Sequence, residues 1–112
     1  MRRKSRDISL SGENAFKLAF AGNKVVTSDL VFYYRQNGTD AGRVGLVVGR
    51  KAFAGAVTRN RLKRRLRELF RRHAGAMSGF DLVVVARRGR PEPKFEILER
   101  QFKKLAGTLE GR

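Results

Sequence analysis

The sequence predicts one domain of the α+β class, an α/β sandwich in which helices pack against a single sheet. Its 112 residues, 41% of them hydrophobic, suffice for one modest core. Apolar residues follow the three-four spacing of a helix in some segments and the runs or alternation of a strand in others. In order, these segments read helix, strand, strand, helix, strand, helix. A further short strand after the first helix is possible on this pattern but not required by it, so the expected order is α-β-β(-β)-α-β-α.

The first helix is expected over residues 13–21. Ser11 precedes it and can act as the N-cap, and Glu13 suits the positive end of the helix dipole. Gly22 and Asn23 together form a stop signal. The sequence therefore predicts a short helix that ends before the sheet begins.

Two antiparallel strands are expected next. Residues 25–35 are rich in Val, Phe and Tyr, and residues 43–49 form a second apolar segment after a loop crowded with turn-forming residues. The optional short strand would lie at 24–27. Because the loop at Gly22 is short, the register of the strand that carries Tyr33 is predicted only to within about one residue.

The second half of the chain alternates helix, strand and helix. Residues 56–73 carry one apolar stripe, and Gly75 marks the end of this helix. Residues 80–86 hold four successive large apolar side chains, as in a strand buried on both faces. Two prolines introduce the last helix. Its apolar side chains, expected to face the core, are Phe95, Leu98, Phe102, Leu105 and Leu109.

Charge points to a polyanionic partner. Lys and Arg total 26 against 10 acids, which gives a formal net charge of +16. A membrane surface is disfavoured, because Trp is absent and the longest apolar runs are strand-sized. Nucleic acid is therefore the expected partner.

Cysteine usage and the N-terminus bear on location. The absence of Cys excludes disulfides, thiolate nucleophiles and Cys-ligated zinc, and fits a reducing cytoplasm. The basic start is followed by no continuous apolar run, so it is not expected to be a signal peptide. Within a single domain over 1–112, residues 1–9 are expected to form either a flexible basic tail or an arm that touches RNA.

The helix at 56–72 carries eight cations and one acid in seventeen positions. Helical geometry places Asn60, Arg64, Arg67 and Arg71 opposite the apolar stripe, whereas Arg59 falls nearer that stripe. Solvated surface helices normally mix the two signs of charge, which this one does not. Because like charges four residues apart repel, a bound polyanion would stabilise the helix.

Residues 59–64, Arg-Asn-Arg-Leu-Lys-Arg, between Gly55-Ala56-Val57 and Arg67-Glu68, resemble the signature motif of the bacterial ribonuclease P protein subunit. Residues 43–48 with Lys51 resemble the strand that enters this helix in that family, and residues 80–87 the strand that leaves it. With residues 16–20, Phe-Lys-Leu-Ala-Phe, the resemblance covers about residues 10 to 107. The link at 52–55 departs from the family in being longer and less polar.

The resemblance implies a fold like ribosomal protein S5 domain 2, with a left-handed βαβ crossover. It also implies a role as an accessory protein in an endoribonuclease, where Mg²⁺ held mainly by a catalytic RNA removes the 5′ leader of precursor tRNA. The protein would be a monomer in the complex, although the edge of a short sheet leaves self-association open. The residues expected to bind the catalytic RNA are Arg59, Asn60, Arg61, Lys63, Arg64, Arg67 and Arg71.

The same resemblance implies a groove for the single-stranded leader between the first helix and the sheet. Stacking of bases on aromatic rings tolerates any base. However, aromatic residues four apart on a short helix, such as Phe16 and Phe20, are more often core. Alternation puts Tyr33 opposite Phe32 and Tyr34, and the resemblance favours Tyr33 as the exposed residue. The residues expected to bind the leader are Phe16, Lys17, Phe20, Tyr33, Val47 and Lys51.

No residue is expected to be catalytic or to bind a metal. His73 is the only histidine and follows two arginines at a helix end. Most acids are scattered singly, and the spacing of Glu92, Glu96 and Glu99 is explained by the dipole of the last helix. The alternatives are a ribosomal or other structural RNA-binding protein without a role in tRNA processing, and a stand-alone endonuclease.

Overall fold

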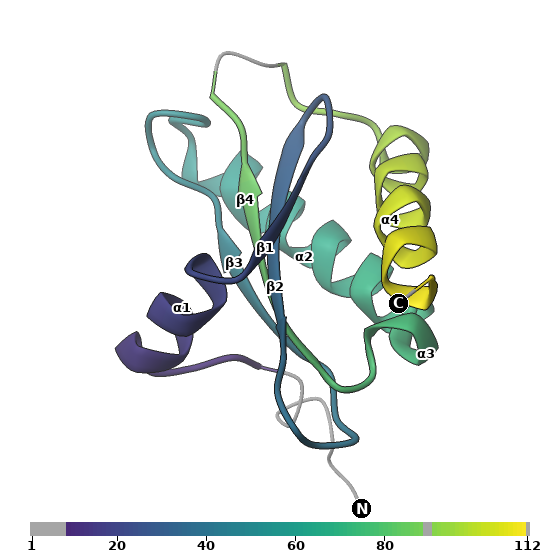
Figure 1. The fold of residues 1–112 in the computed structure, drawn as a ribbon. Helices are drawn as coiled ribbons and strands as arrows, with labels where there is room; N and C mark the ends of the chain where they lie inside the picture. Colours follow the sequence, from purple (N-terminus) through teal and green to yellow (C-terminus); the bar gives the residue numbers. More distant parts are fainter. Residues whose placement is uncertain (1–8, 89–90, 112) are drawn as a thin grey trace, which may run out of the picture.

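The computed structural model describes residues 9–88 and 91–111, and its elements follow the predicted order (Figure 1). The optional short strand after the first helix is present as β1, and one further short helix, α3, follows the basic helix. The elements are α1 (Glu13–Phe20), β1 (Asn23–Val26), β2 (Leu30–Gln36), β3 (Arg43–Val47), α2 (Ala56–Arg72), α3 (Ala74–Met77), β4 (Phe80–Ala86) and α4 (Phe95–Glu110). The α+β fold predicted from the sequence is confirmed.

The four strands form one sheet in the order β1-β2-β4-β3. β2 runs antiparallel to both β1 and β4, and β3 runs parallel to β4. The strands β2 and β3 therefore run antiparallel, as expected, but they do not pair, because β4 lies between them. The central place of β4 explains its continuous apolar sequence, since six of its seven residues are buried. The hand of the crossover from β3 through α2 to β4 stays a prediction.

Helices cover the two faces of the sheet unequally (Figure 1). Leu30, Phe32 and Tyr34 of β2 point to the main core, which α2, α3 and α4 cover. The ring of Phe32 meets that of Phe102 in α4 edge to face, with centroids 5.2 Å apart. On the opposite face, α1 packs over a smaller cluster formed by Leu10, Ala19 and Val83. One short helix cannot cover this face, and part of it stays open.

Three local expectations are wrong. The N-cap of α1 is Gly12, with a φ of 91°, and not Ser11; no side chain of residues 9–88 or 91–111 caps the helix. Helix α2 ends at Arg72, and the chain continues through His73 into α3 rather than ending at Gly75. Ser9, the last residue of the predicted flexible tail, forms a parallel bridge with Val44 of β3. Residues 1–8 of that predicted tail lie outside the described residues.

Candidate nucleic-acid interface

The outer face of α2 presents four exposed polar and cationic side chains that we call the basic face, made of Asn60, Arg64, Arg67 and Arg71, whereas Lys63 is half-buried. The basic face forms because Leu62, Leu66 and Leu69 turn the opposite side of the helix into the core. Arg64 and Arg67 are exposed, and within the described residues neither has an ion-pair or hydrogen-bond partner. Their charges are therefore available to a polyanion.

Arg59 is used inside the protein. Its Nη1 donates to the carbonyl oxygens of Phe53 at 2.9 Å and Ala54 at 2.7 Å. Phe53 is itself buried, and the amides of Ala52 and Phe53 donate to the carbonyl of Gly49. The link that departs from the family is thus anchored from both ends. Arg59 is half-buried, in agreement with its predicted place near the apolar stripe.

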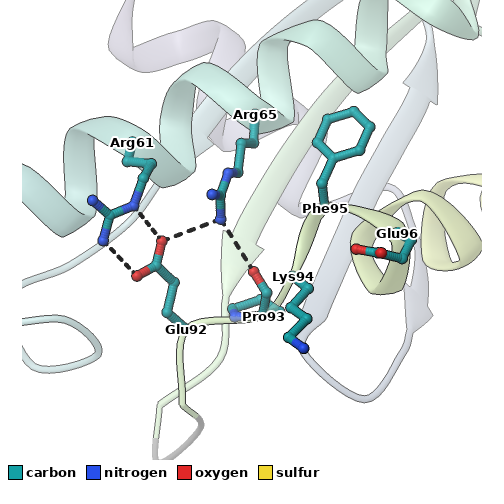
Figure 2. Close-up of a pocket in the computed structure, with 7 residues that line it drawn as sticks. All are labelled: Arg61, Arg65, Glu92, Pro93, Lys94, Phe95 and Glu96. Carbon is teal, nitrogen blue, oxygen red and sulfur yellow. Dashed lines mark hydrogen bonds and ion pairs between the residues drawn. The ribbon is translucent and has the colours of Figure 1, made fainter.

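Arg61 is held by a carboxylate from a distant segment (Figure 2). Its Nε and Nη2 each donate to one carboxylate oxygen of Glu92 at 2.7 Å. Arg65, one turn further along α2, reaches the same carboxylate with Nη1 at 3.3 Å. Hydrogen bonding from Arg61 lowers the pKa of Glu92, and the same contact raises the pKa of Arg61. We call Arg61, Arg65 and Glu92 the clasp.

The far end of α2 carries the one acid of the helix. Glu68 accepts hydrogen bonds from Arg71 at 3.0 Å and from Arg72 at 3.4 Å. The guanidinium of Arg72 also lies 4.9 Å from the ring centroid of Phe95. Arg71 is exposed but paired, so it is less available to a partner than Arg64 or Arg67.

A second surface lies where α1 meets the sheet, and we call it the aromatic patch: Phe16, Phe20 and Tyr33. The ring centroids of Phe16 and Phe20 are 6.4 Å apart, and those of Phe20 and Tyr33 are 4.8 Å apart. Phe20 is 42% exposed, whereas Phe16 and Tyr33 are half-buried. Tyr33, expected to be the exposed residue, does point away from the main core, in which its neighbours Phe32 and Tyr34 are buried, but it is half-buried because it packs on the cluster beneath α1.

Beside the aromatic patch, four valines form a row across the sheet. The register pairs Val26 with Val31, Val31 with Val85, and Val85 with Val47. They lie on the same face as Tyr33, because alternate residues of a strand share a face. Val26 is 47% exposed and Val47 is 36% exposed. This valine row continues the aromatic patch over the part of the face that α1 leaves open.

The two lysines predicted for the leader site lie close in sequence to residues of this surface. Lys17 follows Phe16 on α1, and Lys51 lies in the turn after β3. Both side chains are exposed, and neither forms a hydrogen bond or ion pair with the rest of the described chain. Their charges are free to meet phosphates.

The side chains that could act as catalytic acids, bases or metal ligands have structural roles instead. Asp81 is 1% exposed, receives two hydrogen bonds of 2.9 Å from Arg43, and accepts a third from Asn37. His73 stacks on Phe102 with centroids 6.3 Å apart, and its buried Nε2 has no hydrogen-bond partner among the described residues. Among residues 9–88 and 91–111, no three His, Cys, Asp or Glu side chains lie close enough to hold a metal ion. No helix in these ranges is long and apolar enough to cross a bilayer.

A comparison with protein-family models matches residues 5–110 to one family, described as Ribonuclease P. The chain belongs to the ribonuclease P protein family. The ribonuclease P protein component of Pseudomonas entomophila (strain L48) is 42% identical over 103 residues, which cover 90% of this chain and 77% of that protein. The component from Pseudomonas paraeruginosa (strain DSM 24068 / PA7) is 41% identical over 102 residues, 89% of this chain and 76% of that protein.

Solved structures of ribonuclease P proteins share the fold. The protein from Thermotoga maritima matches with a TM-score of 0.77 at 36% identity, covering 88% of this chain and 94% of that one. A Staphylococcus aureus ribonuclease P protein mutant with defective mRNA degradation activity matches with a TM-score of 0.83, covering 95% of this chain and 91% of that one. At 23% identity, the second likeness shows the fold alone.

The structure brings some of the predicted site residues together and gives others partners within the protein, while their roles in binding RNA stay predictions. The structure brings Phe16, Phe20 and Tyr33 together and sets Val47 on the same face. The seven α2 residues predicted to bind the catalytic RNA fall into three groups. Arg61 belongs to the clasp, Arg59 donates to carbonyls of the link at 52–55, and the other five bind neither Glu92 nor that link. The helix dipole therefore does not account for Glu92, whose carboxylate binds Arg61 and Arg65, and Arg65 is a member of this surface that the motif does not indicate. No local sequence signal marks the pairing of Glu92 with Arg65, because the two residues stand 27 positions apart.

Proposed function

We propose that this chain acts as the protein subunit of ribonuclease P. The basic face of α2 binds the catalytic RNA, and the aromatic patch with the valine row binds the 5′ leader of precursor tRNA. The protein assists endonucleolytic removal of the leader and contributes no catalytic group. It works in the cytoplasm, as a monomer within the complex.

The observation that carries this proposal is the pair of exposed arginines, Arg64 and Arg67, on the helix that bears the family motif; neither has a partner in the described part of the chain. Cations without a protein partner are the groups that release counterions from RNA phosphates most readily. The aromatic patch supports the second half of the proposal. An exposed ring such as Phe20 can stack on a base, which is worth about 1 to 3 kcal/mol and needs no particular sequence.

Magnesium is assigned mainly to the RNA subunit. The described part of the chain offers no group of three ligand-type side chains, so its residues do not fit a metal centre of their own. The protein's cations instead replace some of the ions that fold the RNA and hold the substrate. Mg²⁺ bound to RNA would supply the charge stabilisation for hydrolysis of the phosphodiester.

Reconstitution tests the proposal. Full-length protein added to the ribonuclease P RNA at low Mg²⁺ is expected to restore accurate 5′ cleavage, while the protein alone cleaves nothing. The Glu68→Gln and His73→Gln variants should keep the cleavage rate at saturating substrate, provided that they fold and bind RNA. Cleavage by the protein alone would move catalysis onto the chain. Co-purification with ribosomal RNA instead of ribonuclease P RNA would favour the structural alternative.

A further inference from the structure

The clasp joins two parts of the chain that are far apart in sequence. Arg61 and Arg65 stand one turn apart on α2, while Glu92 comes from the segment between β4 and α4. Both oxygens of the carboxylate are used: Oε1 accepts from Arg61, and Oε2 accepts from Arg61 and Arg65. One acid therefore fixes the positions of two neighbouring guanidinium groups (Figure 2).

The carboxylate occupies only one edge of the Arg61 guanidinium. Nε and Nη2 point at Glu92, and the third nitrogen, Nη1, points away from it (Figure 2). The side chain of Arg61 is 36% exposed. Because a guanidinium carries five N–H donors in a rigid plane, an edge held by carboxylate leaves the opposite edge able to bind a phosphate.

The acid is itself held on a stiff segment. Pro91 and Pro93 flank Glu92 and fix two backbone φ angles, and Pro93 is buried. The carbonyl oxygen of Pro93 lies 3.5 Å from Nη1 of Arg65, which adds a second, weaker contact with α2. The carboxylate thus has a defined place against the helix, and the two arginines take their places from it.

We propose that Glu92 is a positioning residue for RNA binding. It holds Arg61 and Arg65 in one arrangement, so that their outward N–H groups meet phosphates of the folded RNA partner at a set spacing. This inference rests on the proposed docking of α2 on the catalytic RNA. It predicts that an acid in a strongly basic protein improves RNA recognition, although it removes one unit of positive charge.

Charge and order have opposite effects here, and this makes the proposal testable. Removing a carboxylate raises the net charge, which strengthens binding to every RNA. Freeing two long arginine side chains adds an ordering cost on binding, because each must then be immobilised in the complex. The charge effect does not depend on the structure of the RNA. The ordering cost applies only to an RNA that contacts both guanidinium groups in their fixed positions.

The experiment compares Glu92→Gln with Glu96→Gln in the full-length protein. Glu96 lies four residues further along, in the first turn of α4, is exposed, and has no ion-pair partner among the described residues, so it matches the change in charge without the loss of an ion pair. Dissociation constants are measured for the ribonuclease P RNA and for an unrelated structured RNA of equal length, at one fixed salt concentration. Glu96→Gln should tighten both complexes by a similar factor and leave their ratio unchanged. Glu92→Gln should reduce the preference for ribonuclease P RNA by about fivefold or more.

Two further variants separate the explanations. Glu92→Asp keeps the charge but shortens the side chain by one methylene, so it should also lower the preference, whereas a pure charge effect would leave it unchanged. Lysine has a single ammonium group and cannot reproduce the two-point contact that Arg61 makes with Glu92. In an Arg61→Lys background, Glu92→Gln should therefore lower the preference much less than in the wild-type chain. Thermal unfolding of each variant confirms that binding is measured on folded protein.

The outcomes discriminate between this proposal and the docking on which it rests. If Arg64→Ala leaves binding of ribonuclease P RNA unchanged, the docking of α2 is wrong. If Arg64→Ala weakens binding while both Glu92 variants keep the wild-type preference, docking stands and the positioning role is overturned. A Glu92→Gln variant that binds ribonuclease P RNA more selectively than wild type would make Glu92 a competitor of RNA, and this too overturns the proposal.

Discussion

The phenyl ring of Phe16 lies directly on the backbone of Gly45. A Cβ atom on Gly45 would stand 2.4 Å from Cζ and 2.7 Å from Cε1 of that ring. Because real Cβ atoms do not come so close to other heavy atoms, Gly45 lets α1 approach β3 at this spacing. The contact also sets where the aromatic patch lies on the sheet.

Gly45→Ala should therefore destabilise the protein by about 1 to 3 kcal/mol, as expected when extra volume enters a close contact. The free energy of unfolding is measured by urea denaturation. Phe16→Leu in the same chain should recover part of the loss, since the ring atoms that collide are removed. Gly107→Ala is the control: it lies in α4 with no heavy atom near its Cβ position, and it should stabilise by about 0.5 to 1 kcal/mol. A neutral Gly45→Ala would mean that the ring moves aside freely.

Phe20→Ala should cost less than about 1 kcal/mol of stability, because the ring is 42% exposed. The same variant should lower the preference of the holoenzyme for precursor over mature tRNA, since a stacking ring is lost. Phe102→Ala is the contrasting case. Its ring is fully buried, and truncation should cost about 3 to 5 kcal/mol. Large destabilisation by Phe20→Ala with an unchanged tRNA preference would assign that ring to the core.

Replacing both Arg64 and Arg67 by alanine should weaken binding to ribonuclease P RNA and flatten its dependence on salt. Each lost phosphate contact lowers the slope of log affinity against log salt by about 0.7 to 0.9. The matched control replaces Lys103 and Lys104, two exposed cations on α4, and removes the same charge. The control should change the slope less. An equal change in both double variants would show that only total charge matters.

Asp81→Asn should destabilise the fold by about 1 to 3 kcal/mol, because the buried carboxylate accepts three hydrogen bonds and one amide oxygen cannot replace them all. The figure is below that of a fully buried pair, since Arg43 is partly exposed. Asp40→Asn removes an exposed acid and should stay within about 0.5 kcal/mol. Equal stability of the two variants in urea would contradict the structural role given to Asp81.

The clasp should stabilise the fold at neutral pH and fail in acid. The pKa of Glu92 is lowered in the folded protein, so its stabilisation is complete above the ordinary pKa of a glutamate. It is lost as the pH falls through the lowered, folded-state pKa. The difference in unfolding free energy between the wild type and Glu92→Gln should thus shrink from about pH 7 to about pH 2. A difference that stays constant over this range would show that the ion pair contributes nothing to stability.

Local patterns predicted the helices and strands accurately where one environment dominates a whole segment. The strand at 80–86 matches β4 because both of its faces are buried, which demands an unbroken apolar run. Helix α2 follows the three-four spacing of Leu62, Leu66 and Leu69. Helix caps were harder: Ser11 has a suitable side chain, yet the backbone turns one residue later, at Gly12. Cap choice depends on where the helix meets the sheet, which no local pattern encodes.

The α+β class, the strong positive charge of α2 and the family motif all follow from local sequence, because periodicity and composition act within a few residues of one another. Tertiary structure decided which groups those residues meet. It inserted β4 between β2 and β3, set Phe16 on Gly45, and brought Glu92 to Arg61 across 31 positions of sequence. Such pairings depend on how whole elements pack, so an arginine that reads as a phosphate ligand in the sequence can already hold a carboxylate in the fold.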